Sequence, residues 1–394
     1  MVGDQSHGWA QEIKRVFPDS DVVTKTFEPS WRVDSKHRYL VLNYETFQQP
    51  DTEEKLRRFL DGQRIDFIVI DEIHYAKQRQ EKEMSQRKRL VQELITEAAK
   101  TSPRVCVLGL SATPIINNLQ EGKSLVELIT SDDHDDLKTK SSVANCMRLH
   151  QKLVTLGTRW RPAYSTQLHT ETVDVDCGRY VEEIKELGKS CSPLDYEKVL
   201  TKARIPAIIL ALEGGKRSLI YTHYVDEIDS MLKQAINDAG FSVGFYTGND
   251  KSGIDAFKRG DLDALIGSSS IGTGVDGLQH CCNQLIINVL PWTNAEYEQL
   301  VGRLWRQGQQ QSDVRVVLPV TYADINGERW SYCQTKLNRI SYKKTIGDAA
   351  VDGVVPEGNL RSPKQASKDL MTWLHRLIDG ASAGGGSEAG AGAG

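Results

Sequence analysis

The chain has 394 residues, of which 39% are hydrophobic and 26% charged, and its formal net charge is −4. This length exceeds what one hydrophobic core usually supports, so we expect two domains or slightly more. The near balance of charge gives no bulk basic character, so any surface for an anionic partner must be local. No apolar run is long enough to cross a bilayer, and the N-terminus lacks a secretory signal.

Seven cysteines are present without the paired spacing of a zinc site, and we interpret them as reduced thiols. Together with the absence of a signal, this predicts a soluble intracellular protein. The location is expected to be the cytoplasm or nucleoid of a prokaryote, or the nucleus of a eukaryote.

Short apolar runs alternate with amphipathic helical stretches, a pattern typical of α/β proteins with parallel sheets covered by helices. In the first half we predict a helix at 85–100 and strands at 39–43, 65–70 and 104–110. The carboxyl ends of these strands are the expected places for chemistry.

The pattern is interrupted by an acidic stretch at 131–140 and an irregular region at 161–192, so we place the domain boundary near 178–192. In the second half we predict a helix at 226–239 and strands at 217–222, 241–246, 263–267, 284–290 and 314–320. The predicted domains are a first lobe at 1–178, a second lobe at 179–346, a helical extension at 347–379 with its helix at 363–378, and a disordered tail at 380–394.

Two carboxylates follow the predicted strand at 65–70, in the sequence Asp-Phe-Ile-Val-Ile-Asp71-Glu72-Ile-His74. A strand-end Asp can hold the Mg²⁺ that neutralises triphosphate oxygens, and the next acid can orient and deprotonate the attacking water. We therefore assign the metal to Asp71 and the general base to Glu72. The alternative is a solvated acidic strand end that leads into a loop.

A second polar strand end, Leu110-Ser111-Ala112-Thr113-Pro114, follows the predicted strand at 104–110. The hydroxyls of Ser111 and Thr113 can bond to the neighbouring strand-end carboxylates, giving a contact that reports nucleotide state. A Ser/Thr-Pro turn that leads into a helix is the alternative.

These strand ends resemble motifs II and III of superfamily-two helicases, and a third segment makes the resemblance specific. Gln299-Leu-Val-Gly302-Arg303-Leu-Trp305-Arg306-Gln-Gly308-Gln309 resembles motif VI of the Swi/Snf-related ATPases. The resemblance covers residues 8 to 345 in motif order. It implies two tandem RecA-like parallel-sheet lobes, ATP as the substrate, Mg²⁺ as the cofactor and duplex DNA as the partner.

Two arginines three residues apart on a helix share a face, and guanidinium forks suit bidentate contacts with phosphate. We therefore predict that Arg303 and Arg306 reach the γ-phosphate from the opposing lobe, with Arg306 as the arginine finger. Two isolated arginines would instead indicate a basic surface that forms salt bridges.

The segment at 268–278 resembles motif V, although Asp276 stands where Asn is common and Gly277 is added; an ordinary glycine-rich loop is the alternative. Weaker resemblances to motifs Ia, Ib, IV and IVa lie elsewhere in the two halves. Together with motifs II, III, V and VI, these resemblances imply two sets of roles. Roles in ATP binding or coupling fall to His74, Ser111, Thr113, Gly274, Asp276 and Gln299. Nucleic-acid contacts fall to Lys14, Asn43, Thr222, Gly248 and Ser270.

Several aromatic and basic residues are interpreted as structural. Trp292 and Trp305 are predicted to pack in the fold instead of stacking on bases. For the basic run after Glu72, a solvated mixed-charge surface is favoured over a DNA-binding role. This run comprises Lys77, Arg79, Lys82, Arg87, Lys88 and Arg89.

The sequence contains no Gly-x-x-x-x-Gly-Lys-Ser/Thr loop to cradle phosphate. Gly122-Lys123-Ser124 is interpreted as a coincidence, because Asn117 stands at the first glycine position and the segment lies on a predicted helix. We expect an incomplete first lobe with unpaired sheet edges and exposed apolar helix surface. Three alternative explanations for the absent loop are ranked in this order: a truncated reading frame, a motor divided between two polypeptides, and a degenerate copy.

The leading hypothesis is an ATP-driven, double-stranded-DNA translocase that hydrolyses ATP poorly by itself, with a possible polypeptide partner that supplies the phosphate loop. A non-catalytic DNA-binding or scaffolding remnant is the second hypothesis. A motor subunit of a restriction or phage-defence system is the third. Translocation is favoured over strand separation, because Swi/Snf-related motors track duplex DNA without unwinding it.

Overall fold

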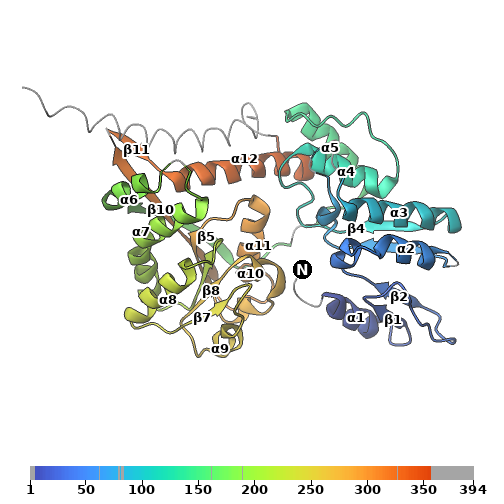
Figure 1. Cartoon of the computed structure of the whole chain (residues 1–394), viewed down its shortest axis with the longest axis horizontal. Coiled ribbons are helices and arrows are strands. Elements are labelled where there is room, and N and C mark those ends of the chain that lie inside the picture. The colour runs from blue at the N-terminus through green and yellow to red at the C-terminus, as the bar shows by residue number, and fades with distance from the viewer. Residues whose placement is uncertain are drawn as a thin grey trace, which may run out of the picture. The chain divides into compact units, whose positions relative to one another are not determined.

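The computed structural model describes residues 5–355 except 62, 79, 81–83, 161, 189 and 326 (Figure 1). The chain divides into two compact units, the first built from Met1–Arg159 with Thr345–Leu360 and the second from Trp160–Lys344. Helix α12 (Tyr332–Asp352) begins in the second unit and ends in the first. The helix predicted at 363–378 and the tail at 380–394 lie outside the described residues.

A seven-stranded sheet forms the centre of the second unit, in the order β11-β10-β9-β6-β8-β7 with β5 also paired to β10. All pairings are parallel except that of β10 with β11. The strands are β5 (Gln167–Asp176), β6 (Ser218–Thr222), β7 (Val243–Tyr246), β8 (Ala264–Gly267), β9 (Gln284–Val289), β10 (Asp313–Ile325) and β11 (Glu328–Trp330).

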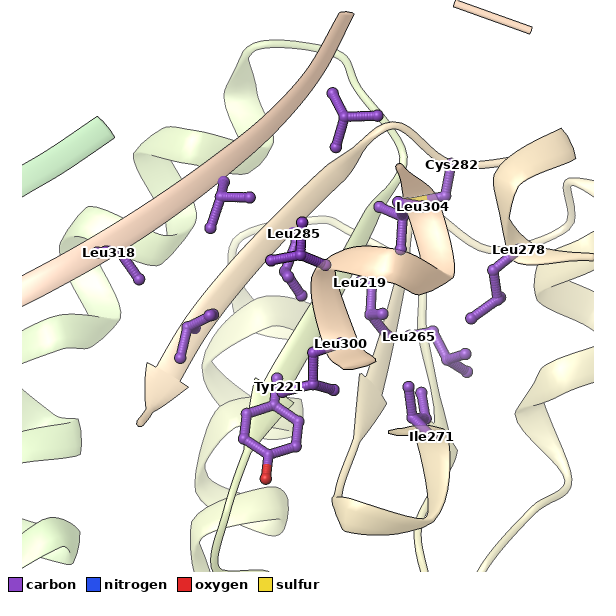
Figure 2. Close-up of a cluster of buried hydrophobic side chains, with 14 of the residues drawn as sticks. Leu219, Tyr221, Leu265, Ile271, Leu278, Cys282, Leu285, Leu300, Leu304 and Leu318 are labelled. Atoms are coloured by element: carbon purple, nitrogen blue, oxygen red, sulfur yellow. The ribbon is translucent and has the colours of Figure 1, made fainter. Parts of the chain in front are cut away.

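Helices cover both faces of this sheet because successive residues of its strands point to opposite sides. In β6, Leu219 joins the apolar cluster beneath α10 and α11, whereas Ile220 joins the cluster beneath α7 and α8. Figure 2 shows Leu300 and Leu304 of α11 in the first of these clusters, with Leu219. The helices of this unit are α6 (Val181–Glu186), α7 (Pro193–Glu213), α8 (Ile228–Asp238), α9 (Gly253–Arg259), α10 (Ser269–Gly274) and α11 (Asn294–Leu304), with 3₁₀ turns η3 (Gly178–Tyr180) and η4 (Leu278–His280).

The first unit holds two parallel strand pairs, β1 (Asp21–Thr24) with β2 (Arg38–Val41) and β3 (Phe67–Ile70) with β4 (Cys106–Gly109). Its apolar cluster joins the buried face of β3 to side chains of α2, α3 and α4. The helices are α1 (Gln5–Val16), α2 (Thr52–Leu60), α3 (Gln86–Thr101), α4 (Leu119–Thr130) and α5 (Val143–Leu156), with 3₁₀ turns η1 (Tyr44–Gln48) and η2 (Ile73–Ala76).

One face of the β3–β4 pair is exposed. Ile68 and Ile70 are buried, but Phe67 is 54%, Val69 43% and Leu108 43% exposed. Parallel sheets usually carry helices on both faces, so an apolar face open to solvent is unusual. We expected exposed apolar surface on helices of the first lobe. Val16 of α1 and Val154 and Leu156 of α5 are exposed, and this sheet face is exposed as well.

The predicted fold class is confirmed, since both units are α/β and built on parallel sheets. The predicted boundary near 178–192 is wrong, because the units divide at Arg159 and Trp160. The physical reason is β5, which was expected to be irregular but pairs in parallel with β10 from Gln167 to Asp176. Among the described residues, no helix has the length and hydropathy needed to cross a membrane.

Candidate functional site

The ends of β3 and β4 lie side by side, as the two strand-end motifs predict. The amide of Leu110 donates to the carbonyl of Ile70 at 2.9 Å, and the amide of Ile73 donates to the carbonyl of Leu110 at 2.9 Å. These bonds hold the Asp71-Glu72 turn against the start of the Ser111-Ala112-Thr113 segment. Glu72 has φ 46°, a left-handed conformation that non-glycine residues rarely adopt.

His74 joins the side chains of this turn to the second motif. Its Nδ1 lies 3.0 Å from Ser111 Oγ and 3.1 Å from Glu72 Oε2, and the Thr113 amide donates to Ser111 Oγ at 3.2 Å. His74 is 5% exposed, so its ring is held in a buried position. The structure therefore brings Glu72, His74, Ser111 and Thr113 together.

Asp71 is held by groups that the sequence analysis did not single out. Its Oδ2 accepts a hydrogen bond from the indole of Trp9 at 2.9 Å, and its carbonyl accepts one from the Tyr44 hydroxyl at 2.9 Å. Burial, with a smaller contribution from the Asp71 and Glu72 charges, raises the pKa of Tyr44 well above its usual range, although Arg87 opposes this. Tyr44 therefore stays protonated and donates to the turn.

The donor set of this turn suits a hard cation. Asp71 and Glu72 offer carboxylate oxygens, which Mg²⁺ prefers, and Mg²⁺ is commonly held by one or two carboxylates plus waters and substrate phosphates. Thr113 Oγ1 is buried without a hydrogen-bond partner, and Glu72 Oε2 is buried with His74 Nδ1 beside it at 3.1 Å, so both oxygens retain capacity for a further ligand. Among the described residues of 5–355, which exclude the gaps stated above, no cluster of three or more His, Cys, Asp or Glu side chains is placed to hold a metal. Asp71 as the metal ligand thus stays a prediction.

A buried ion pair supports the second motif from beneath. The side chains of Lys77 and Glu121 are 6% and 0% exposed, and Lys77 Nζ lies 3.1 Å from Glu121 Oε1. Glu121 Oε2 also accepts from the amides of Ile116 and Asn117 at 2.7 and 2.8 Å. Burial alone raises the pKa of Glu121, but Lys77 and these hydrogen bonds outweigh it and the pKa is lowered.

Gly122-Lys123-Ser124 lies within α4, as predicted, and not in a loop. A Cβ at Gly122 would stand 2.6 Å from Leu149 and 2.8 Å from Ile115, so close helix packing accounts for this glycine. Ser124 Oγ donates to the carbonyl of Glu121 at 2.8 Å. The segment therefore has a packing role.

In the second unit, helix α11 and the residues after it contact the segment that resembles motif V. Arg303 donates to the carbonyl of Val275 at 2.9 Å and to that of Gly272. Arg306 Nη1 lies 2.8 Å from Asp276 Oδ1. Gln299 also lies near this loop, because its Oε1 is 3.8 Å from where a Cβ of Gly272 would stand. Gly274 ends the short helix α10.

The predicted nucleic-acid residues have local structural roles. Asn43 accepts the amide of Thr46 at 3.1 Å as the N-cap of η1, and Thr222 is fully buried with its hydroxyl donating to the carbonyl of Tyr224 at 2.7 Å. Lys14 donates to the carbonyl of Ser20. Ser270 Oγ donates to the carbonyl of Tyr246 at 3.4 Å, and Gly248 is exposed after β7. Their contacts with nucleic acid stay predictions.

The described members of the basic run have partners within the fold, although Lys88 is buried and does not lie on the solvated surface that we expected. Lys88 is 4% exposed and donates to Gln78 Oε1 at 2.9 Å, and Arg89 lies 2.6 Å from Glu53. Arg87 stands over the Tyr44 ring at 5.0 Å. Arg79 and Lys82 lie outside the described residues.

Trp305 also packs within the second unit. Its indole donates to the carbonyl of Thr166 at 2.8 Å, and its ring meets Tyr164 edge-on.

Two family models match the chain. Helicase conserved C-terminal domain matches residues 201–308, and Type III restriction enzyme, res subunit, matches residues 4–116. The first range includes the motif V segment and the motif VI segment as far as Gly308, and the second includes Asp71, Glu72 and Ser111. With the curated relatives, these matches support a similarity to superfamily-two helicase-like ATPase motors.

Two curated proteins are similar. The chain is 23% identical to Uncharacterized ATP-dependent helicase YqhH of Bacillus subtilis (strain 168), over 92% of this chain and 70% of that protein. It is 25% identical to DEAD-box ATP-dependent RNA helicase RhpA of Helicobacter pylori (strain ATCC 700392 / 26695), over 37% of this chain and only 32% of that protein.

The chain is also similar to many solved structures, of which two serve as examples. One is a variant of S. cerevisiae Dbp5 bound to RNA and ADP BeF3, 13% identical with a TM-score of 0.42, over 91% of this chain and 74% of that one. The other is Mycobacterium smegmatis helicase Lhr bound to ssDNA and AMP-PNP, 14% identical with a TM-score of 0.44, over 84% of this chain and 39% of that one.

Proposed function

We propose that this chain is the motor of an ATP-driven, double-stranded-DNA translocase of the Swi/Snf type. The observation that carries the proposal is the cluster at the ends of β3 and β4, where His74 lies between Glu72 and Ser111 at 3.1 and 3.0 Å. His74 links the proposed base, Glu72, to the hydroxyl of Ser111 at the end of the neighbouring strand. Such a link suits a site at which a change in the bound nucleotide is transmitted to the rest of the protein.

The chain's own residues take separate roles in this proposal. Asp71 would hold Mg²⁺, which supplies neutralising charge to the phosphates, and Glu72 orients and deprotonates the attacking water. Arg303, whose guanidinium donates to the carbonyls of Val275 and Gly272, shapes the motif V loop. Arg306 acts as the arginine finger on the same triphosphate.

The present partner of Arg306 is compatible with that role. The ion pair with Asp276 is exposed, with side-chain exposures of 36% for Arg306 and 79% for Asp276. Exposed ion pairs contribute only about 0–1 kcal/mol, so a phosphate can displace Asp276 at little cost. Bidentate contact with phosphate is also stronger than a single contact with a carboxylate.

The phosphate-binding loop is proposed to come from a polypeptide segment outside these 394 residues, because the sequence contains no such loop. The exposed apolar side chains of Phe67, Val69 and Leu108 support a covering segment on the β3–β4 face. A strand and helix that flank a glycine-rich loop would bury this face.

The test measures phosphate release by the chain, with and without an added segment that carries a glycine-rich phosphate loop. Each arm is run with duplex DNA, single-stranded DNA, RNA or no nucleic acid, and Glu72→Gln serves as the inactive control. We expect turnover only with the added segment, and stimulation by duplex DNA above the other nucleic acids. No turnover in any arm would favour a non-catalytic DNA-binding or scaffolding remnant, and stimulation by RNA alone would overturn the DNA assignment.

A second candidate is the motor subunit of a restriction system. The match to Type III restriction enzyme, res subunit, over residues 4–116 favours it. Restriction acts at particular sequences, so this candidate requires stimulation that depends on the sequence of the duplex. Equal stimulation by unrelated duplexes of the same length would exclude it.

A further inference from the structure

The start of helix α11 is fixed by a local set of hydrogen bonds. Thr293 caps the helix by accepting the Glu296 amide at 3.2 Å, and Glu296 Oε2 accepts the Thr293 amide at 3.3 Å. The same Glu296 oxygen accepts the amide of Trp292 at 3.1 Å. The backbone of Trp292 is therefore part of the cap of the helix that carries Gln299 and Arg303.

The side chain of Trp292 is held between two elements of the second unit. Its indole donates to the Tyr224 hydroxyl at 3.1 Å, just after β6. On the side of α12, the Lys336 ammonium stands 4.2 Å from the centre of the indole ring, and Arg339 stands 5.7 Å from it. Lys343 also donates to the carbonyl of Trp292 at 3.4 Å.

The Lys336 ammonium is the unusual member of this arrangement. Lys336 is 1% exposed, and its Nζ makes no hydrogen bond to any described residue. Its ion pair with Glu197 is long, at 3.6 Å, and the other oxygen of Glu197 pairs with Arg204 at 2.9 Å. Burial lowers the pKa of Lys336, although Glu197 opposes this.

A buried ammonium without hydrogen bonds is costly unless another group stabilises it. The face of an indole is the best aromatic partner for a cation, and the attraction grows when both groups are removed from water. The Trp292 ring therefore compensates Lys336, and in return Lys336 restrains the ring. Because the Trp292 amide belongs to the α11 cap, that restraint reaches the helix start.

We propose that Lys336 and Trp292 are positioning residues that fix the start of α11 and so the placement of Gln299, Arg303 and Arg306. The proposal rests on the proposed ATPase function for its catalytic consequence, but its structural part stands separately. Neither residue touches the triphosphate in this scheme. A role in ordinary packing would instead predict that their loss loosens the whole second unit.

The test compares hydrogen exchange of the amides at 295–304 in four proteins: the unsubstituted chain, Lys336→Met, Lys336→Arg and Lys344→Met. Methionine keeps the length of the lysine stem without the charge, and Glu197 keeps its bond to Arg204. Arginine returns a cation to the indole face. Lys344→Met is the matched control, because it removes an ammonium from α12 whose ion pair with Glu298 of α11, at 2.8 Å, is exposed.

In Lys336→Met we expect exchange at 295–304 to rise on the order of tenfold, while β6 and β8 keep their protection. Lys336→Arg and Lys344→Met should stay within about twofold of the unsubstituted chain. Trp292→Phe, which keeps a ring but loses the bond to Tyr224, should give an intermediate rise even if Lys336→Met fails to fold. Unchanged exchange at 295–304, or an equal rise across β6 and β8, would overturn the proposal.

Steady-state hydrolysis in the presence of the added phosphate-loop segment supplies the catalytic readout. Lys336→Met should lower kcat by about tenfold and leave KM for ATP unchanged, because Arg306 acts in the transition state. If the unsubstituted chain shows no hydrolysis at all, the proposed function fails, and the exchange data still decide whether Lys336 positions α11. A raised KM with unchanged kcat would contradict the positioning role.

Discussion

Replacement of Glu121 by glutamine should destabilise the first unit severely. Glutamine keeps the size of the side chain and an oxygen that can accept from the amides of Ile116 and Asn117, but it removes the carboxylate charge that pairs with the Lys77 ammonium. That ammonium is 6% exposed and lies 3.1 Å from the carboxylate it would lose. Breaking a buried pair by removing one partner costs about 3–5 kcal/mol, and we expect the lower end because the two amide bonds can be kept.

The measurement is the free energy of opening of the first unit in urea. Opening is monitored by thiol labelling of Cys146, and peptide mass spectrometry identifies the labelled cysteine. Cys146 is fully buried in α5, so labelling reports opening of this unit alone. The control is Glu54→Gln, whose ion pair with Arg58 is 69% exposed on the Glu54 side and should cost no more than about 0.5 kcal/mol. A loss below about 1 kcal/mol for Glu121→Gln would refute the reasoning.

The pH dependence of stability provides a second readout of the same pair. The pKa of Glu121 in the folded protein is lowered from 4.5. A carboxyl with a depressed folded pKa contributes stability that is fully present above its unfolded pKa and is lost as pH falls through the folded value. The unsubstituted chain should therefore lose stability below about pH 4.5 more steeply than Glu121→Gln, when both are followed by Cys146 labelling.

Three further outcomes are expected at the two groups of site residues. Trp9→Phe removes the indole donor from Asp71 Oδ2, which frees that oxygen for a metal ion. The affinity of the protein for Mn²⁺ in the presence of ATP should therefore rise by about two- to tenfold, as measured by a magnetic-resonance titration. Weaker Mn²⁺ binding would show instead that the indole supports the metal site. In the presence of the added phosphate-loop segment, Arg306→Lys should lower kcat by about a thousandfold with little change in KM for ATP, and a change in KM alone would contradict the finger role. Arg303→Lys loses the fork between the carbonyls of Val275 and Gly272, so limited proteolysis near 272–276 should accelerate, whereas Arg306→Lys should not change it.

Strands of the central sheet were predictable because burial on both faces leaves a continuous apolar run in the sequence. β6, β8 and β9 are buried at every residue, and the predicted runs at 217–222, 263–267 and 284–290 differ from them by only one residue at an end. The two strand-end motifs were likewise predictable, because parallel strands place their carboxyl ends at one sheet edge.

β5 was not predictable in the same way. Only one of its ten residues is buried, so its sequence is mostly polar and resembles a loop. Its weak signal is the alternation of Val173 and Val175, both of which contribute to apolar clusters. Because the strand's stability comes from its long ladder with β10, a local pattern could not reveal it, and the boundary between the units was placed too late.

Contacts between residues that are distant in the sequence also could not be predicted. Trp9 reaches Asp71 across 62 positions, and nothing in either local sequence specifies that contact. Glu121 lies beside the glycine and lysine that superficially suggest a phosphate loop, and its burial shows instead that the segment is a helix built around an ion pair. Local patterns predict which elements form, whereas the choice of long-range polar partners depends on how the elements pack.

Arg303 in α11 and Arg306 just after it have different partners in the structure, although the sequence motif predicts the same role for both. Their spacing predicts a shared face, yet Arg303 donates to two backbone carbonyls, which cannot move away without opening the loop, whereas Arg306 pairs with a carboxylate that is 79% exposed. A side chain that must exchange its partner during a reaction cycle needs the weaker, solvated partner. The structure therefore favours Arg306 as the group that moves and Arg303 as the group that holds the loop. The different effects on proteolysis that we expect for their lysine variants follow from this difference alone.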